Sequence, residues 1–281
     1  MRRYAVRFES GENVYALNYV RPASLAEALH FLQNNPEARP LSGGMTLVPT
    51  LKQRLAAPSH LVDLTRLPEL KGIRREGNIL RIGAATPHAE VANSAVVAAA
   101  IPALAQLAGL IADPQVRNRG TIGGSVANND PAADYPSAVL GLNATVVTSS
   151  RRIAADDFFI GMFETALTPG ELVVALEFPL PGRASYLKYR HAASGYAVVG
   201  VFVAQRGAEV RVAITGAGPS VFRWRDAEAA LQRECSVAAL DGVAIDPAEM
   251  LDDMHAPAPY RANLVGVYTR RAVAALTGAS R

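Results

Sequence analysis

Cysteine is almost absent from this sequence of 281 residues, in which only Cys235 occurs. A single thiol excludes an internal disulfide. It also excludes an iron–sulfur cluster or a cysteine-based zinc site held by this chain alone, because such sites need several thiolates. The absence of a disulfide framework is typical of a reducing compartment, and the N-terminus MRRYAVRFESGENVY lacks the apolar core of a signal peptide. We therefore expect a cytoplasmic protein.

The sequence also lacks a concentration of charge and a metal-binding pattern. Its formal net charge is +3, and the basic residues are scattered, so we expect no nucleic-acid partner. The histidines show none of the spacings that bind metals, and we assign no metal site. They are His30, His60, His88, His191 and His255.

One apolar stretch, Ala95 to Ala112, has the length of a membrane span. It consists mostly of alanine and is interrupted by Pro102, Gln106 and Gly109. These interruptions favour two short packed helices, and we expect no integral membrane span.

The first part of the chain predicts alternating strands and helices. Ser24 and Glu27 form a capping-box pattern at the start of a helix. ARPL and HLVDL are typical of strands on either side of a second helix in MTLVPTLKQRLA, which gives a small βα-type unit. Next, KGIRREGNILRIGAAT predicts a strand pair around a Glu-Gly-Asn turn, and Thr86 is placed to cap a helix that has Pro87 at its first position.

Further along, ATVVTS and ELVVALEFPLP predict strands, and a short helix is expected around PSAVLGL. From Ser185 onward, strands are followed by helices, an α+β pattern. We place a domain boundary near Leu180–Arg183.

Two segments contain adjacent glycines, LSGGMT and GTIGGSVAN. Glycine permits positive φ and lets backbone N–H groups approach an anion closely. Both pairs have hydroxyl neighbours suited to phosphate oxygens, namely Ser42, Thr46, Thr121 and Ser125. Each pair alone could be a simple tight turn. Neither segment matches the dinucleotide fingerprint or the P-loop pattern.

Three segments together resemble one known family: LSGGMTLVPTLKQRLAAPSHLVDL, DPQVRNRGTIGGSVANNDPAAD and GELVVALEFPLP. They are similar to the FAD-binding medium subunit of molybdenum hydroxylases, the family of the carbon monoxide dehydrogenase medium subunit and the xanthine dehydrogenase FAD domain. The resemblance runs from about Tyr19 to the end of the chain.

The resemblance implies an α+β protein with a two-subdomain FAD-binding fold of the vanillyl-alcohol-oxidase type, followed by a small α+β C-terminal domain. We accordingly expect an N-terminal extension over residues 1–18, an FAD-binding domain over 19–181 that is split near residue 70, and a C-terminal domain of the medium-subunit type over 182–281.

The resemblance also implies the cofactor-binding residues, and it assigns no catalytic residue. Both glycine segments would bind the FAD pyrophosphate through Leu41, Ser42, Gly43, Gly44, Met45, Thr46, Thr121, Ile122, Gly123, Gly124 and Ser125. Asp134 would hold the ribityl or adenylate part, and Leu172 and Val173 would lie near the flavin–adenine end. Lys188 would approach the cofactor, and Tyr196 would lie near the isoalloxazine ring, with His191 as a weaker candidate neighbour.

Several of these residues have simpler interpretations on sequence alone. Asp134 could be a helix-start or turn residue, Lys188 a solvated side chain, and Tyr196 ordinary core. The chain also departs from the family pattern. Met45 stands where relatives often carry Gln or His, and Asn128 and Asn129 stand where many medium subunits read Ala-His-Ala or similar.

The function implied is that of an FAD-binding electron-transfer subunit of a molybdenum hydroxylase. It would bind FAD non-covalently and pass electrons from [2Fe-2S] clusters of a small partner subunit to an external acceptor, namely NAD, a quinone or oxygen. The molybdenum cofactor would lie on a large partner subunit. The alternatives are a stand-alone flavin oxidoreductase and a flavin-free nucleotide-binding or scaffold protein of the same fold.

Overall fold

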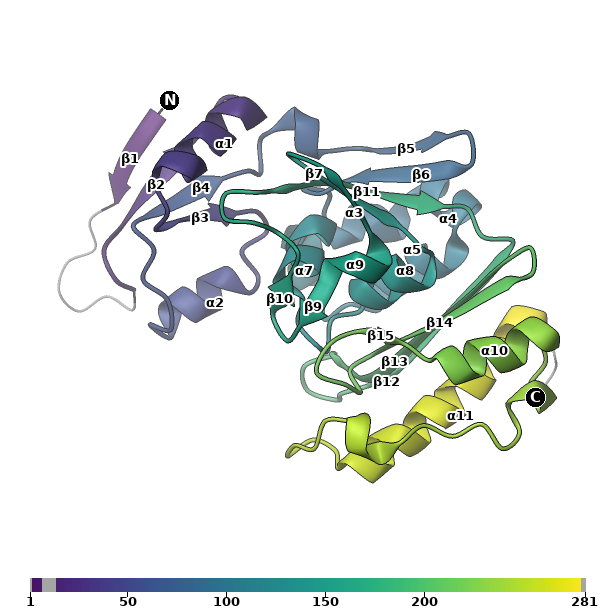
Figure 1. The fold of residues 1–281 in the computed structure, drawn as a ribbon. Coiled ribbons are helices and arrows are strands. Elements are labelled where there is room, and N and C mark those ends of the chain that lie inside the picture. The colour runs from purple at the N-terminus through teal and green to yellow at the C-terminus, as the bar shows by residue number, and fades with distance from the viewer. Residues whose placement is uncertain (1, 7–13, 279–281) are drawn as a thin grey trace.

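The computed structural model describes residues 2–6 and 14–278. Three main sheets follow one another along the chain, with helices packed between and around them (Figure 1). Residues 1 and 7–13, which belong to the expected N-terminal extension, lie outside the described residues.

The N-terminal sheet has the strand order β1-β2-β4-β3. Its strands are β1 (Arg2–Val6), β2 (Leu17–Arg21), β3 (Ala38–Leu41) and β4 (His60–Asp63). The β1 and β2 strands pair antiparallel, whereas β2 and β3 both run parallel to β4. Two helices belong to this part of the chain, α1 (Leu25–Asn34) and α2 (Leu47–Lys52).

The predicted cap of α1 is confirmed. The Ser24 hydroxyl accepts a hydrogen bond from the Glu27 N–H at 3.2 Å. The Glu27 carboxylate accepts one from the Ala23 N–H at 2.6 Å, one residue earlier than in the standard capping box.

The central sheet is antiparallel, with the order β5-β6-β11-β7-β8. Its strands are β5 (Ile73–Glu76), β6 (Ile79–Gly83), β7 (Thr145–Thr148), β8 (Arg152–Ala154) and β11 (Val173–Pro179). The β11 strand inserts between β6 and β7, so that Leu176 lies opposite Ile82 on one side and Val146 on the other. Leu172, just before β11, packs in the same core as the strands of the N-terminal sheet.

A group of short helices packs against the central sheet: α3 (His88–Asn93), α4 (Ala95–Ala100), α5 (Pro102–Gly109), α6 (Pro114–Arg119), α7 (Ile122–Asn128) and α8 (Tyr135–Gly141). The stretch of membrane-span length is therefore two helices that break at Ile101, as the sequence predicts. Within the described ranges, no helix is long and apolar enough to span a membrane. A short helix α9 (Ala155–Phe158) leads into a hairpin of β9 (Phe159–Gly161) and β10 (Glu164–Thr165).

The C-terminal sheet is antiparallel and consists of β12 (Arg183–Arg190), β13 (Ala197–Arg206), β14 (Glu209–Thr215) and β15 (Phe222–Arg223). One face is covered by α10 (Arg225–Arg233) and α11 (Ala258–Thr277) (Figure 1). The other face packs on α5 and α8, where Tyr186 and Phe202 join the same core as Leu104 and Tyr135. The chain changes sheets between β11 and β12, near the predicted boundary. The division into domains stays a prediction.

One local prediction is wrong. Thr86 does not cap α3, because Pro87 occupies the cap position, and the buried Thr86 hydroxyl has no hydrogen-bond partner among the described residues. For the second glycine pair, the alternative of a simple tight turn does not hold, since Gly123 and Gly124 lie in the first turn of α7.

Candidate functional site

The two glycine segments meet in space, although Ser42 and Thr121 lie 79 positions apart in the sequence. The Ser42 hydroxyl, just after β3, lies 2.9 Å from the Thr121 hydroxyl at the N-cap of α7. The Thr121 hydroxyl also accepts a hydrogen bond from the Gly124 N–H at 3.2 Å. The N-terminal sheet is thereby joined to the helical layer at this point.

Close packing explains most of the glycines. A Cβ atom at position 43 would lie 2.1 Å from the Arg119 carbonyl oxygen, and one at position 123 would lie 2.4 Å from the Ala84 Cβ. Of the four glycines in the two pairs, only Gly44 adopts a positive φ, of 75°. The first pair therefore has the conformational role expected from the sequence, and the second pair instead lets α7 approach the loop after β6.

The two segments also differ in the backbone N–H groups that they offer. In α7, the Ile122 and Gly123 N–H groups donate to the carbonyl oxygens of Thr86 and Ala84, and the Gly124 N–H donates to the Thr121 hydroxyl. In the first segment, the N–H groups of Gly43, Gly44 and Met45 have no acceptor within the described part of the chain. The first segment is thus the one with free backbone donors.

Around this junction lies a cavity of about 690 Å³, within the usual range for ligand sites. All the cofactor-binding residues assigned from the sequence line it except Ile122 and Lys188, and the weaker candidate His191 lines a neighbouring cavity instead. Ile122 packs in the central core, and Lys188 is buried in an ion pair with Asp134.

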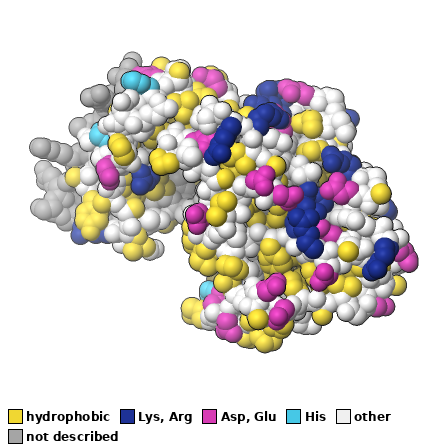
Figure 2. Space-filling model, viewed as in Figure 1, with side chains coloured by type: hydrophobic (Ala, Val, Ile, Leu, Met, Phe, Trp, Pro, Cys, Tyr) yellow, Lys and Arg dark blue, Asp and Glu magenta, His cyan; other side chains and the backbone are white. Residues whose placement is uncertain are grey.

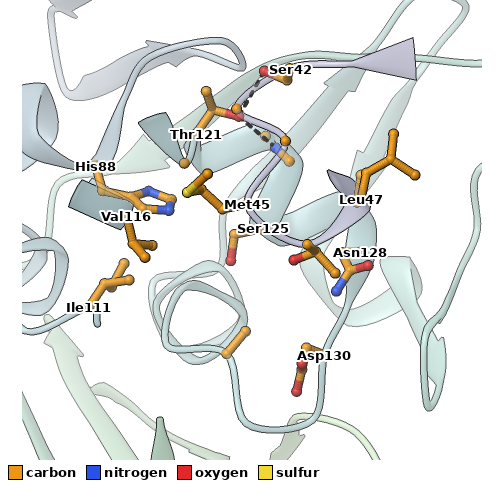
Figure 3. A pocket seen from close by; sticks show the side chains of 18 of the residues that line it. Ser42, Met45, Leu47, His88, Ile111, Val116, Thr121, Ser125, Asn128 and Asp130 are labelled. Carbon is orange, nitrogen blue, oxygen red and sulfur yellow. Dashed lines mark hydrogen bonds between the residues drawn. The ribbon is translucent and has the colours of Figure 1, made fainter. Parts of the chain in front are cut away.

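The cavity has an apolar wall on either side of the junction. Figure 3 shows Met45 and Ser125 near the middle of the view, with Ile111 and Val116 on one side and Leu47 on the other. The wall beside the N-terminal sheet contains Leu64, Leu70 and Leu172.

Asp134 and Lys188 form a buried ion pair. The Lys188 Nζ lies 2.9 Å from a carboxylate oxygen of Asp134, and both side chains are at most 3% exposed. The Tyr186 hydroxyl donates to the same carboxylate. Burial raises the pKa of Asp134, while the positive charge of Lys188 and both hydrogen bonds oppose this rise.

This pair changes the interpretation of both residues. The Asp134 side chain makes no capping hydrogen bond to α8, so it is not a plain helix-start aspartate. Lys188 is not solvated. It donates to the Gly195 carbonyl oxygen at 2.8 Å and so fixes the segment that ends at Tyr196.

Tyr196 lies at the rim of the cavity and is 43% exposed, so it is not ordinary core. Burial of its hydroxyl, with the nearby carboxylates of Asp130 and Asp134, raises its pKa. An exposed aromatic ring at a cavity rim can contact a flat ligand.

His88 and Asp130 also line the cavity, although the sequence did not indicate either of them (Figure 3). His88 is 4% exposed, and its Nδ1 has no partner among the described residues. Burial, together with the positive charge of Arg117, lowers its pKa to about 4, so the ring is neutral near pH 7. Burial raises the pKa of Asp130. No local pattern identifies either residue.

The two asparagines that depart from the family pattern have separate roles. Asn128 lines the cavity. Asn129 ends α7 at a positive φ of 43°, and its side-chain amide donates to the carbonyl oxygens of Gly161 and Glu164. Asn129 therefore fastens the β9–β10 hairpin beside the cavity. In the described ranges, no group of three or more His, Cys, Asp or Glu side chains could hold a metal ion.

The family model and the relatives that match this chain agree with one another. The family described as FAD binding domain in molybdopterin dehydrogenase matches residues 13–181. The carbon monoxide dehydrogenase medium chain of Hydrogenophaga pseudoflava is 36% identical, over 91% of this chain and 95% of its own length. The nicotine 6-hydroxylase medium subunit of Paenarthrobacter nicotinovorans is 34% identical, over 92% of this chain and 96% of its own.

Solved structures agree with these relatives. A carbon monoxide dehydrogenase chain from H. pseudoflava has a TM-score of 0.85 at 36% identity, with 92% of this chain and 96% of that chain covered. A chain of quinoline 2-oxidoreductase from Pseudomonas putida 86 has a TM-score of 0.86 at 29% identity, with coverages of 94% and 98%. The chain belongs to the family of FAD-binding medium subunits of the molybdenum hydroxylases.

Proposed function

We propose that this chain holds FAD in the 690 Å³ cavity and passes electrons from an iron–sulfur partner subunit to an external acceptor. The observation that carries the proposal is the junction of the two glycine segments. There, the free N–H groups of Gly43, Gly44 and Met45 lie next to two hydroxyl groups. These hydroxyl groups belong to Thr121, at the N-cap of α7, and to Ser125, within α7. Backbone N–H groups and hydroxyls at one place favour phosphate oxygens.

The residues present fit FAD, which carries a pyrophosphate between two ring systems. The junction supplies the polar contacts, and apolar walls lie on either side of it. The Ser125 hydroxyl lines the cavity and makes no hydrogen bond to another described residue, so it is free to donate to a phosphate.

The other assigned residues would shape the pocket. Asp134 and Lys188 would act chiefly by fixing the Gly195–Tyr196 segment, because their charges already satisfy each other. When bound, FAD supplies the redox chemistry, while the protein supplies position and electrostatics. We therefore assign no catalytic acid or base to this chain.

The single cysteine supports a multisubunit assembly. An iron–sulfur cluster is usually held by about four thiolates, and this chain has only Cys235. We propose that the clusters lie on a small subunit and the molybdenum cofactor on a large one, in a cytoplasmic complex. The two relatives described above are themselves named a medium chain and a medium subunit.

The visible absorption spectrum of the purified protein tests this function. FAD gives a flavin band that is lost on denaturation and filtration, whereas a flavin-free scaffold gives none. Candidate substrates added to the lone chain give a second test. Bleaching of the flavin by a substrate without any partner subunit would favour a stand-alone flavin oxidoreductase.

A further inference from the structure

A second cavity of about 290 Å³ adjoins the FAD cavity. The two share Asp130, Ser194 and Tyr196 in their walls, so the Tyr196 side chain contributes to both. We call the second cavity the side pocket. Its remaining walls come from the β9–β10 hairpin, the α7–α8 loop, the β12–β13 connection with the start of β13, the residue after β14, and the segment before α11 with the first turn of that helix.

The side pocket offers aromatic surface and a hydrogen-bond donor. Phe163, at the tip of the hairpin, is 58% exposed, and hydrophobic side chains gather near this part of the molecule in Figure 2. The rings of His191 and His255 lie 4.8 Å apart, edge to face. The Ser194 N–H donates to Nδ1 of His191 at 3.2 Å. In the neutral ring, the proton therefore resides on Nε2, which can donate to a ligand.

The side pocket does not offer a free cation. Among its described lining residues, Arg261 is the only arginine or lysine. All five of its N–H groups are used, by the carbonyl oxygens of Val198, Gly216 and Ala256 and by both carboxylate oxygens of Asp253. Asp130 adds an acidic group. A ligand with phosphate groups would find no partner for its charge there, which disfavours a dinucleotide such as NAD.

We propose that the side pocket binds a small neutral quinone, which accepts the electrons of reduced FAD. This inference rests on the proposed function. A quinone is flat, carries carbonyl oxygens that can accept a hydrogen bond from His191, and can pack against Phe163 and Tyr196. Bound FAD in its reduced form would supply two electrons and two protons. The quinone would take up both electrons and both protons, so that its two carbonyl groups would become the two hydroxyl groups of the hydroquinone and FAD would be left oxidised.

Reoxidation of the flavin tests the proposal. The FAD-loaded protein is reduced anaerobically by light in the presence of EDTA and mixed with tail-free ubiquinone, and the return of the flavin band is followed. The rate should saturate with quinone concentration, and NAD should not restore the band. Phe163→Ala and His191→Leu should each raise the half-saturating concentration about tenfold, because a packing contact or a hydrogen bond is lost.

A matched control is available on the same hairpin. Ile160 is also 58% exposed but does not line the side pocket, and Ile160→Ala should leave the half-saturating concentration unchanged. A rate that rises linearly with quinone, or that ignores the Phe163 and His191 variants, overturns the proposal. So does saturable reoxidation by NAD.

Measuring quinone binding to FAD-free protein distinguishes an error about the side pocket from an error about the proposed function. Calorimetry should show that tail-free ubiquinone binds and that Phe163→Ala and His191→Leu weaken this binding. Binding that neither variant weakens contradicts the side pocket whether or not FAD is present. A protein that binds quinone in this way but never acquires a flavin band contradicts the proposed function instead.

Discussion

At position 43, even a methyl group would collide with the backbone of another segment, since its Cβ would lie 2.1 Å from the Arg119 carbonyl oxygen. We expect Gly43→Ala to push the two glycine segments apart, to destabilise the protein by about 1–3 kcal/mol and to lower FAD occupancy. Thermal unfolding and the flavin band per protein measure these effects. Gly109→Ala is the control, because its Cβ would meet only the Ala92 Cβ, at 3.9 Å. Equal FAD occupancy in both variants would argue against the junction.

His88 makes the folded protein sensitive to acid, because burial lowers its pKa to about 4. The unfolded chain takes up a proton near pH 6.5, whereas the folded chain does so only near pH 4, so the free energy of unfolding falls as pH falls between these values. We expect a loss on the order of 3 kcal/mol over this range, relative to His88→Gln. Urea denaturation of both proteins at several pH values measures the difference. Parallel pH profiles would show that His88 is not held neutral.

At the scale of elements, Asp134 and Lys188 join the start of α8 to β12. Asp134→Ala would leave the Lys188 ammonium buried without a counter-charge, although it keeps its hydrogen bond to the Gly195 carbonyl oxygen, and this costs about 3–5 kcal/mol. FAD retention should fall as a result, since the Gly195–Tyr196 segment depends on Lys188. We expect Asp134→Ala combined with Lys188→Met to recover much of the lost stability, measured by urea denaturation. Additive losses in the double variant would instead show that the ion pair is unimportant.

The sequence predicts well those helices whose start or end is determined by residues next to it in the chain. Ser24 and Glu27 cap α1 through neighbouring N–H groups, and Pro102 separates two helices because proline favours a first-turn position. The helical setting of Gly123 could not be predicted in this way. Its cause is contact with Ala84, which is distant in sequence, and TIGG alone is equally typical of a turn.

The sequence likewise predicts only part of the site, namely the part that has a recognisable local pattern. The glycine segments carry a recognisable pattern, and the structure brings them to one cavity. His88 and Asp130 carry no such pattern, because each reaches the cavity only when segments from other parts of the chain fold around it. The Asp134–Lys188 pair likewise requires β12 to lie against α8, and neither residue alone indicates this pairing.

For the whole molecule, the shortage of cysteine sets the last prediction. Under the proposed function, the iron–sulfur clusters must lie on another subunit, because a cluster usually needs about four thiolates and this chain has only Cys235. Affinity purification of the tagged chain from its native host should therefore recover a cysteine-rich small subunit and a large subunit, with iron and molybdenum detectable by elemental analysis. The same purification with Gly43→Ala, which is expected to lower FAD occupancy, shows whether the partner subunits still bind when FAD is lost. Recovery of a free chain that oxidises a substrate unaided would contradict the assembly and leave a stand-alone oxidoreductase.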